Sequence, residues 1–253
     1  MATIVAGNSG VPYHQSTLWL GDFYQPYSGA LAVNQYPILL TQTTSNVQIN
    51  SDTPPPGCKY YARVTVNDTD LPSDPSPRTQ FQSPFNVVTN DQVQFDFWIR
   101  MGYQPSVPTG KFFVLTEIFG SPYSGSPQMS ININNNGDVA FKTEQYPTTT
   151  ATLWQTPLLL NTWMRFSIQA LISTDPTVGW ASLAFANDGT ASVSPQTLTL
   201  GSQSGTQISM QTLNKSSSVV GVNCGIYPTC YRSRGLETTS VVDFAGYQTS
   251  YLT

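Results

Sequence analysis

The sequence predicts an all-β protein, a sandwich of two antiparallel sheets with almost no helix. Helical periodicity is nearly absent along the 253 residues. Short segments rich in Val, Ile, Phe, Tyr and Thr are bounded instead by clusters of Gly, Pro and Asn, the pattern of a β-sandwich or barrel. The length is ordinary for one large all-β domain. Apolar residues make up 39% of the chain, which is enough to form its core.

The clearest strand is VQFDFWIRM at residues 93–101, where Val93, Phe95, Phe97 and Ile99 alternate with other side chains. Because strand side chains point alternately to opposite faces, these four residues predict one buried face. Three further strands are expected in TWMRFSIQALIS (162–173), GWASLAFANDG (179–189) and SVVDFAGYQTSY (240–251).

A hairpin is predicted in MSININNNGDVAFKT at residues 129–143. Its turn contains Asn136-Gly137, a dipeptide that accepts the positive φ angles of a type I′ turn. The stretch NDTDLPSDPSPRTQ (67–80) carries three acids and three prolines, so a loop is expected there.

No linker divides the chain sharply. Residues 1–50 are expected to form an N-terminal arm and an outer strand packed on the same domain, and residues 51–253 the sandwich itself. The single histidine, His14, falls in this arm.

Charged residues make up only 9% of the chain and the net charge is −4, which excludes a basic face for nucleic acid. The longest apolar run, within KFFVLTEIFG, is too short to span a bilayer. A surface of hydroxyl and amide groups suits an extracellular setting or a virion shell, and no signal peptide is visible at the start of the sequence. A phage structural protein, which leaves the cell by lysis, fits both observations.

Cys58, Cys224 and Cys230 form an odd set. The sequence leaves open whether Cys224 and Cys230 form a disulfide or all three are thiols. With one histidine and no Cys-x-x-Cys pair, neither a metal site nor a cofactor is predicted.

Three stretches carry the residues most suited to chemistry. Arg78, Gln80 and Gln82 share one face of their strand because strand side chains alternate, and Glu117 shares a face with Phe119. The third stretch, GVNCGIYPTCYR (221–232), precedes the last strand; its Pro228 is expected to force a turn at the rim of a cleft with Tyr227 facing inward.

The order of these motifs, with WMRF, the Gly-Trp strand and the Ala-Asn-Asp-Gly turn between them, resembles the heparin-lyase-I and alginate-lyase type of polysaccharide lyase over residues 58–251. The resemblance implies a concanavalin-like β-jelly roll whose concave sheet binds an acidic polysaccharide. It also implies which residues surround the uronate, by their positions in the shared motifs: Arg78, Gln80, Gln82, Glu117, Phe119 and Tyr227.

The match to the lyases departs at the positions that matter for catalysis. β-Elimination needs groups that neutralise the uronate carboxylate and a base near the α-proton. Glu117, at the glutamine position, adds negative charge, and Phe119, at the histidine position, cannot transfer a proton. Glu117, Glu144 and Glu237 are also isolated in the sequence, unlike the paired carboxylates of glycosidases.

The sequence therefore favours a non-catalytic jelly roll, carbohydrate-binding or structural, such as a decoration or tail protein on a phage virion. Its expected partners are a polysaccharide or glycan surface and other virion or surface subunits, including copies of itself. The alternative is a lyase acting on a uronic-acid polymer, with Tyr227 and Arg78 as catalytic residues. The expected substrate contacts are Gln80, Gln82, Glu117, Lys142, Tyr231 and Arg232.

Overall fold

The computed structural model of the chain describes residues 17–21, 38–39, 47–70, 76–82, 87–121, 127–145, 149–213 and 223–252. Every regular element in these ranges is a β-strand. No helix in this part of the chain is long and apolar enough to cross a membrane. The all-β prediction is confirmed.

One sheet has nine strands in the order β13-β12-β11-β6-β18-β4-β3, with β1 paired to β18 and β16 paired to β12. The bounds are β1 Thr17–Gly21, β3 Val47–Asn50, β4 Tyr61–Asn67, β6 Gln92–Arg100, β11 Met164–Leu171, β12 Trp180–Ala186, β13 Ser194–Pro195, β16 Gln207–Ser209 and β18 Thr239–Tyr251. All described pairings in it are antiparallel.

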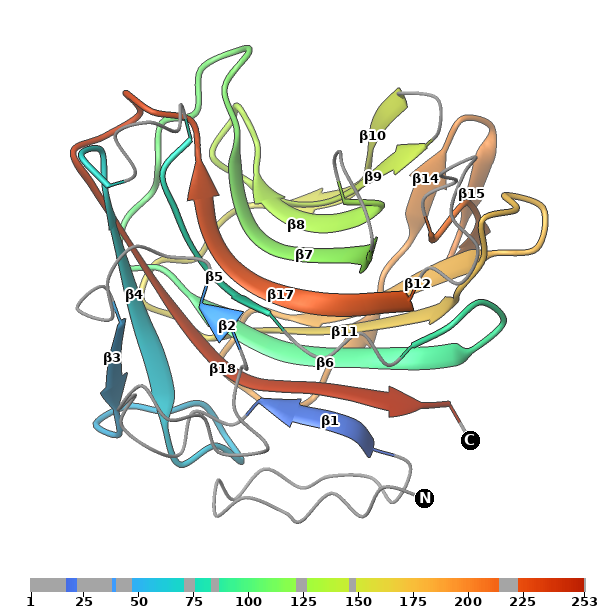
Figure 1. The fold of residues 1–253 in the computed structure, drawn as a ribbon, viewed down its shortest axis with the longest axis horizontal. Helices are drawn as coiled ribbons and strands as arrows, with labels where there is room; N and C mark the ends of the chain where they lie inside the picture. Colours follow the sequence, from blue (N-terminus) through green and yellow to red (C-terminus); the bar gives the residue numbers. More distant parts are fainter. Residues whose placement is uncertain are drawn as a thin grey trace.

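The other sheet has seven strands in the order β10-β9-β8-β7-β17-β5-β2. They are β2 Ile38–Leu39, β5 Arg78–Gln82, β7 Phe113–Ser121, β8 Met129–Ile133, β9 Val139–Gln145, β10 Thr149–Thr156 and β17 Asn223–Arg232. A small separate pair joins β14 (Leu198–Leu200) to β15 (Gln203–Gly205). In Figure 1, β7, β8 and β17 arc around one open side of the molecule, and β6 and β11 run beneath them.

The core lies between the two sheets. Val93, Phe95, Phe97 and Ile99 of β6 are all fully buried, as their alternation predicts. The Phe97 ring stacks on Tyr247 of β18, with ring centroids 4.9 Å apart. Apolar burial of this extent is the main term that stabilises a β-sandwich.

The predicted hairpin forms between β8 and β9, but its turn differs from the expected type I′. A type I′ turn needs positive φ at two residues. Here Gly137 has a φ of 81°, and Asn136 is not among the described residues with positive φ. The Asn134 side chain accepts hydrogen bonds from the backbone N–H groups of Asn136 and Asp138. This side-chain bonding stabilises a longer turn with only glycine in the left-handed region.

The prediction that Pro228 forces a turn is wrong. Asn223–Arg232 is one continuous strand, and Pro228 lies within it. The pairing with β7 shifts register between Pro228 and Tyr231. A β-bulge accommodates the missing N–H of proline without ending the strand.

The described strands from residues 1–50 pair with strands of the sandwich. β1 pairs with β18, β2 with β5, and β3 with β4. The division into an arm and a sandwich domain stays a prediction, and His14 lies outside the described residues.

Candidate functional site

A groove lies on the curved seven-stranded sheet, on the face away from the core. Its cavity has a volume of about 300 Å³. Its lining residues come from five neighbouring strands and the segments beside them: Phe112, Val114, Glu117, Pro127, Ser130, Asn132, Lys142, Thr143, Glu144, Thr150 and Tyr231.

Strand register aligns a row of polar side chains across this groove. Tyr227 pairs with Glu117, Glu117 with Ser130, and Ser130 with Lys142. Directly paired residues of antiparallel strands project to the same face of the sheet. The row therefore runs from β17 through β7 and β8 to β9.

A bulge in β7 places Glu117 in this row. The β7–β8 register shifts between Val114 and Thr116. Leu115 belongs to the core, and the hydroxyl of Thr116 hydrogen-bonds that of Tyr247 from the opposite sheet at 2.7 Å. Two successive residues thus face the core, and the parity of the strand changes after them. Val114 and Glu117 both line the groove as a result.

Glu117 is 6% exposed, and the Nε2 of Gln80 donates a hydrogen bond to its Oε2 at 2.5 Å. Burial raises the pKa of Glu117 to about 7, although the charge of Arg78 and the hydrogen bond from Gln80 act in the opposite direction. The desolvation cost of a buried carboxylate exceeds both stabilising contributions. Near neutral pH the groove therefore contains a carboxyl group that is only partly ionised.

Lys142 does not pair with Glu117 across the sheet, which the sequence left possible. Ser130 stands between them in the row, so two strand spacings of about 4.8 Å separate their backbones. No ion pair reaches the half-buried Lys142 from the described part of the chain. Burial lowers the pKa of its ammonium.

An aromatic pair forms one part of the groove wall. The rings of Phe112 and Tyr231 meet edge to face with centroids 4.8 Å apart. The Arg78 guanidinium lies over the Tyr231 ring, 5.2 Å from its centroid. This arrangement presents a partly exposed ring beside a cation.

Arg78, Gln80, Glu117, Lys142 and Tyr231 are thus brought together on one face. Gln82 lies in β5, paired with Ile38, and its side chain falls outside the described residues.

Two other residues predicted for the site, Tyr227 and Arg232, are buried and not accessible from the groove. Tyr227 faces Glu117 in the row but is only 1% exposed. Arg232 is fully buried, donating to Asp68 at 2.8 Å and to the backbone oxygen of Glu237 at 2.9 Å. Arg232 is therefore a structural residue, and its prediction as a substrate contact is corrected.

Sequence reasoning missed Phe112, Ser130, Asn132, Glu144 and Thr150. A sequence pattern that indicates two of these residues, Ser130 and Asn132, was present. In MSINI the polar Ser130 and Asn132 alternate with core residues, so they occupy one face. Glu144, far from Glu117 in the sequence, lines the same groove because the hairpin places β9 beside β8.

No cysteine is among the described residues that line the groove. All three cysteines are free thiols. Cys224 and Cys230 lie six positions apart on one strand, roughly 20 Å at about 3.3 Å per residue, beyond disulfide reach. The described residues contain no cluster of His, Cys, Asp and Glu that could hold a metal ion.

Solved structures share this architecture. The PL-14 alginate lyase from Aplysia kurodai superposes with a TM-score of 0.60 at 12% identity, covering 93% of this chain and 99% of that chain. The catalytic domain of a glycoside hydrolase family 131 protein from Coprinopsis cinerea gives a TM-score of 0.56 at 15% identity, with 92% and 94% covered. The chain shares the β-jelly-roll fold with these structures.

A carbohydrate esterase from the Shiga toxin-encoding bacteriophage phi24B also superposes, with a TM-score of 0.55 at 10% identity over 94% of this chain and 99% of that chain. No protein-family model and no curated sequence matches the chain. At such identities the likeness establishes the fold, and the jelly-roll prediction is confirmed at that level.

Proposed function

We propose that the protein is a non-catalytic, carbohydrate-binding jelly roll whose groove holds an acidic polysaccharide. The observation that carries the proposal is Lys142, a half-buried cation of the groove that has no ion pair within the described residues. A partly desolvated ammonium is stabilised when a ligand supplies the missing negative charge. The carboxylates of a uronic-acid polymer supply it.

The remaining lining suits the other surfaces of a sugar. Ser130 and Asn132 offer a hydroxyl and an amide to sugar hydroxyls. The rings of Phe112 and Tyr231 offer an apolar surface to the C–H face of the ring. Arg78 lies beside Tyr231 as a second cation.

The burial of the candidate base favours binding without cleavage. A general base must come within hydrogen-bond reach of the proton it removes. Tyr227, the tyrosine that the lyase resemblance assigns, is 1% exposed, and Glu117 is 6% exposed and already bonded to Gln80. A polysaccharide lying in the groove therefore has little access to the Tyr227 hydroxyl or to the Glu117 carboxylate.

The setting we infer is extracellular, on a phage virion surface as a decoration or tail protein. The low content of charged residues and the structural likeness to a phage carbohydrate esterase support this part of the proposal. Sedimentation of the full chain and of a chain lacking residues 1–16, which keeps β1, tests association with further copies. Oligomers formed only by the full chain are expected, and monomers in both cases contradict the assembly.

Calorimetric titration tests the groove. Oligouronates are expected to bind, and neutral cello-oligosaccharides of equal length to bind more weakly. Lys142→Met removes the unpaired cation and weakens oligouronate binding roughly tenfold. Lys59→Gln, which removes the same charge from the exposed Lys59, is the matched control and leaves binding unchanged. Equal affinity for neutral and acidic chains, or an unaffected Lys142→Met variant, contradicts the proposal.

A second candidate, a lyase with a rearranged site, is favoured by the pKa of Glu117. Because burial raises that pKa to about 7, the groove carries less negative charge at neutral pH than the sequence implies. Tyr227 would be the base and acid, Arg78 the group that neutralises the uronate, and Gln80 a positioning residue.

Incubation with alginate, glucuronan and heparin separates the two functions. An absorbance rise from unsaturated uronate, abolished by Tyr227→Phe and by Arg78→Ala, identifies a lyase. A flat trace combined with measurable binding supports the non-catalytic function. A flat trace without binding leaves only a structural role and rejects both candidates.

A further inference from the structure

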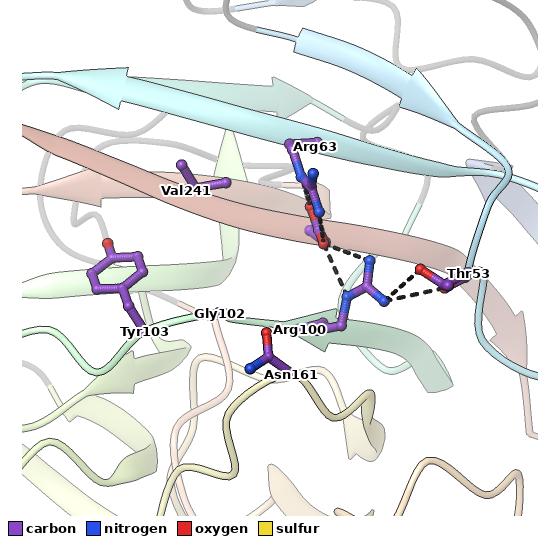
Figure 2. Close-up of a pocket in the computed structure, with 8 residues that line it drawn as sticks. Thr53, Arg63, Arg100, Gly102, Tyr103, Asn161 and Val241 are labelled. Carbon is purple, nitrogen blue, oxygen red and sulfur yellow. Dashed lines mark hydrogen bonds and ion pairs between the residues drawn. The ribbon is translucent and has the colours of Figure 1, made fainter.

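The outer face of the nine-stranded sheet carries a second polar hollow, on the opposite side of the sandwich from the groove. Asp243 of β18 pairs in register with Arg63 of β4 on one side and with Arg100 of β6 on the other. Figure 2 shows the two guanidinium groups converging on this carboxylate, with Thr53 and Asn161 beside them. We call this hollow the outer site; its volume is about 230 Å³.

Hydrogen bonds fix both arginines. Arg63 donates from Nε to Oδ1 of Asp243 at 2.8 Å and from Nη2 to Oδ2 at 3.0 Å. Arg100 donates from Nε and Nη2 to Oδ2 at 3.0 and 2.8 Å, and from Nη1 to the Thr53 hydroxyl at 2.8 Å. Both oxygens of the Asp243 carboxylate accept hydrogen bonds, and all three guanidinium nitrogens of Arg100 donate.

Arg63 keeps an unused edge. Only its Nε side bonds to Asp243, so Nη1 and the second N–H of Nη2 have no partner among the described residues. Its side chain is 41% exposed, against 13% for Arg100. Two parallel N–H groups on a planar guanidinium form a fork that matches a carboxylate.

Asn161 supplies a further polar side chain at the same hollow. Its φ is 58°, a left-handed conformation that is uncommon outside glycine, and its N–H bonds to the oxygen of Met101 at 2.7 Å. Gly102 makes room for it, since a Cβ there would lie 3.3 Å from the Asn161 Oδ1. Asn161 is exposed, so its side chain is accessible to a ligand in the hollow. Unusual backbone geometry of this kind is concentrated at functional sites.

The floor of the outer site is rigid. Arg100 lies between Tyr61 and Trp163, 4.9 and 4.5 Å from the two ring centroids. The indole Nε1 of Trp163 donates to the backbone oxygen of Thr53 at 2.8 Å. Fixed partners reduce the ordering entropy that a ligand must overcome.

Thr53 and Tyr103 add polar side chains to the lining of the hollow, and two carboxyl groups behind them accept hydrogen bonds from tyrosine hydroxyls. The carboxylate of Asp52 accepts a hydrogen bond from the Tyr61 hydroxyl at 2.6 Å, and that of Glu237 accepts one from the Tyr103 hydroxyl at 2.6 Å. A carboxylate attached to several hydroxyl groups uses both the Arg63 fork and the polar side chains of Thr53 and Tyr103 beside it.

We propose that the outer site binds one uronic-acid sugar unit, with the carboxylate on the Arg63 fork and the hydroxyls on the polar side chains of Thr53, Tyr103 and Asn161. A hollow of about 230 Å³ is smaller than pockets for drug-sized ligands, which are roughly 300–1,000 Å³, and this fits a single sugar unit. The outer site is independent of the groove, so the molecule presents two sugar sites on opposite sheets and can link two chains.

Titration of the ¹⁵N-labelled full chain with glucuronate, acetate and glucose tests the outer site. Glucuronate is expected to give saturable shifts at the Trp163 indole N–H and the Asn161 amide, acetate weaker ones, and glucose none. Arg63→Gln weakens glucuronate binding roughly tenfold because one charge-assisted pair is lost. Asn161→Gly removes the amide while it tolerates the positive φ, and it weakens binding as well.

The groove variant Lys142→Met serves as the control and keeps the outer-site shifts, which separates failure of this site from failure of the groove. Unchanged glucuronate affinity in Arg63→Gln overturns the proposal, as does glucose binding equal to glucuronate or the absence of saturable shifts. If Arg63→Gln does not fold, unchanged affinity in Asn161→Gly decides against the site.

Discussion

The amide of Gln80 donates a 2.5 Å hydrogen bond to the carboxyl of Glu117, joining β5 to β7 over the intervening β17. This contact and the charge of Arg78 both favour the ionised carboxylate, yet burial raises its pKa to about 7. The groove therefore changes charge within the physiological pH range.

Stability is expected to decrease as pH rises from about 4.5 to 7. The folded pKa of Glu117 lies above the ordinary glutamate value of 4.5, so the folded protein holds this proton more tightly than the unfolded chain. The stabilisation is fully present below pH 4.5 and is lost as pH rises through the folded pKa. A shift of this size corresponds to about 3 kcal/mol.

Glu117→Gln provides the measurement. Urea unfolding of wild type and variant at pH 5 and pH 8 gives the difference in free energy of unfolding at each pH. The variant is expected to gain stability relative to wild type at pH 8 but not at pH 5. A difference that does not change between the two pH values contradicts the assigned burial effect.

Oligouronate binding in the groove is expected to weaken above pH 7. Uronate carboxylates are already ionised there, so deprotonation of Glu117 places a like charge beside them. Calorimetric titration at pH 6 and pH 8 should show affinity lower by roughly tenfold at pH 8 for wild type. Glu117→Gln, which cannot ionise, should bind equally at both values; a pH dependence that persists in the variant assigns the effect to another group.

The strands were predictable from the sequence because core residues dominate their patterns. Val93, Phe95, Phe97 and Ile99 alternate without interruption, and all are fully buried. The turn at Asn136-Gly137 and the course of the chain at Pro228 were not predictable. Side-chain hydrogen bonds of Asn134 determine the turn, and a β-bulge determines the course of the chain at Pro228. Neither feature produces a periodic pattern of residues in the sequence.

The groove was only partly predictable for the same reason. Alternation correctly grouped Arg78 with Gln80. The bulge in β7 reverses the parity of the strand before Glu117, and the pairing of β8 with β9 decides that Ser130 separates Glu117 from Lys142. Arg232 was misassigned because its burial depends on Asp68, a residue 164 positions away that no local pattern connects to it.

The thiols are expected to differ in reactivity. Burial raises the pKa of Cys224 to about 12 and also raises that of Cys230, so neither forms the nucleophilic thiolate at pH 8. Cys58 is partly exposed. A chromogenic disulfide reagent should titrate at most one thiol in the native protein and all three in guanidinium. Fewer than three thiols in the unfolded, unreduced protein would reveal a disulfide.

Arg232 and Arg78 are expected to separate stability from binding. Arg232 is fully buried and satisfies Asp68 and the backbone oxygen of Glu237, so Arg232→Met should cost about 2–4 kcal/mol of unfolding free energy. Because its side chain does not reach the groove, the folded variant should bind oligouronates as wild type does. Arg78→Met should show the reverse, with weaker binding and a nearly unchanged urea midpoint. Loss of oligouronate binding in an Arg232→Met protein of unchanged stability would show that Arg232 is a substrate contact after all.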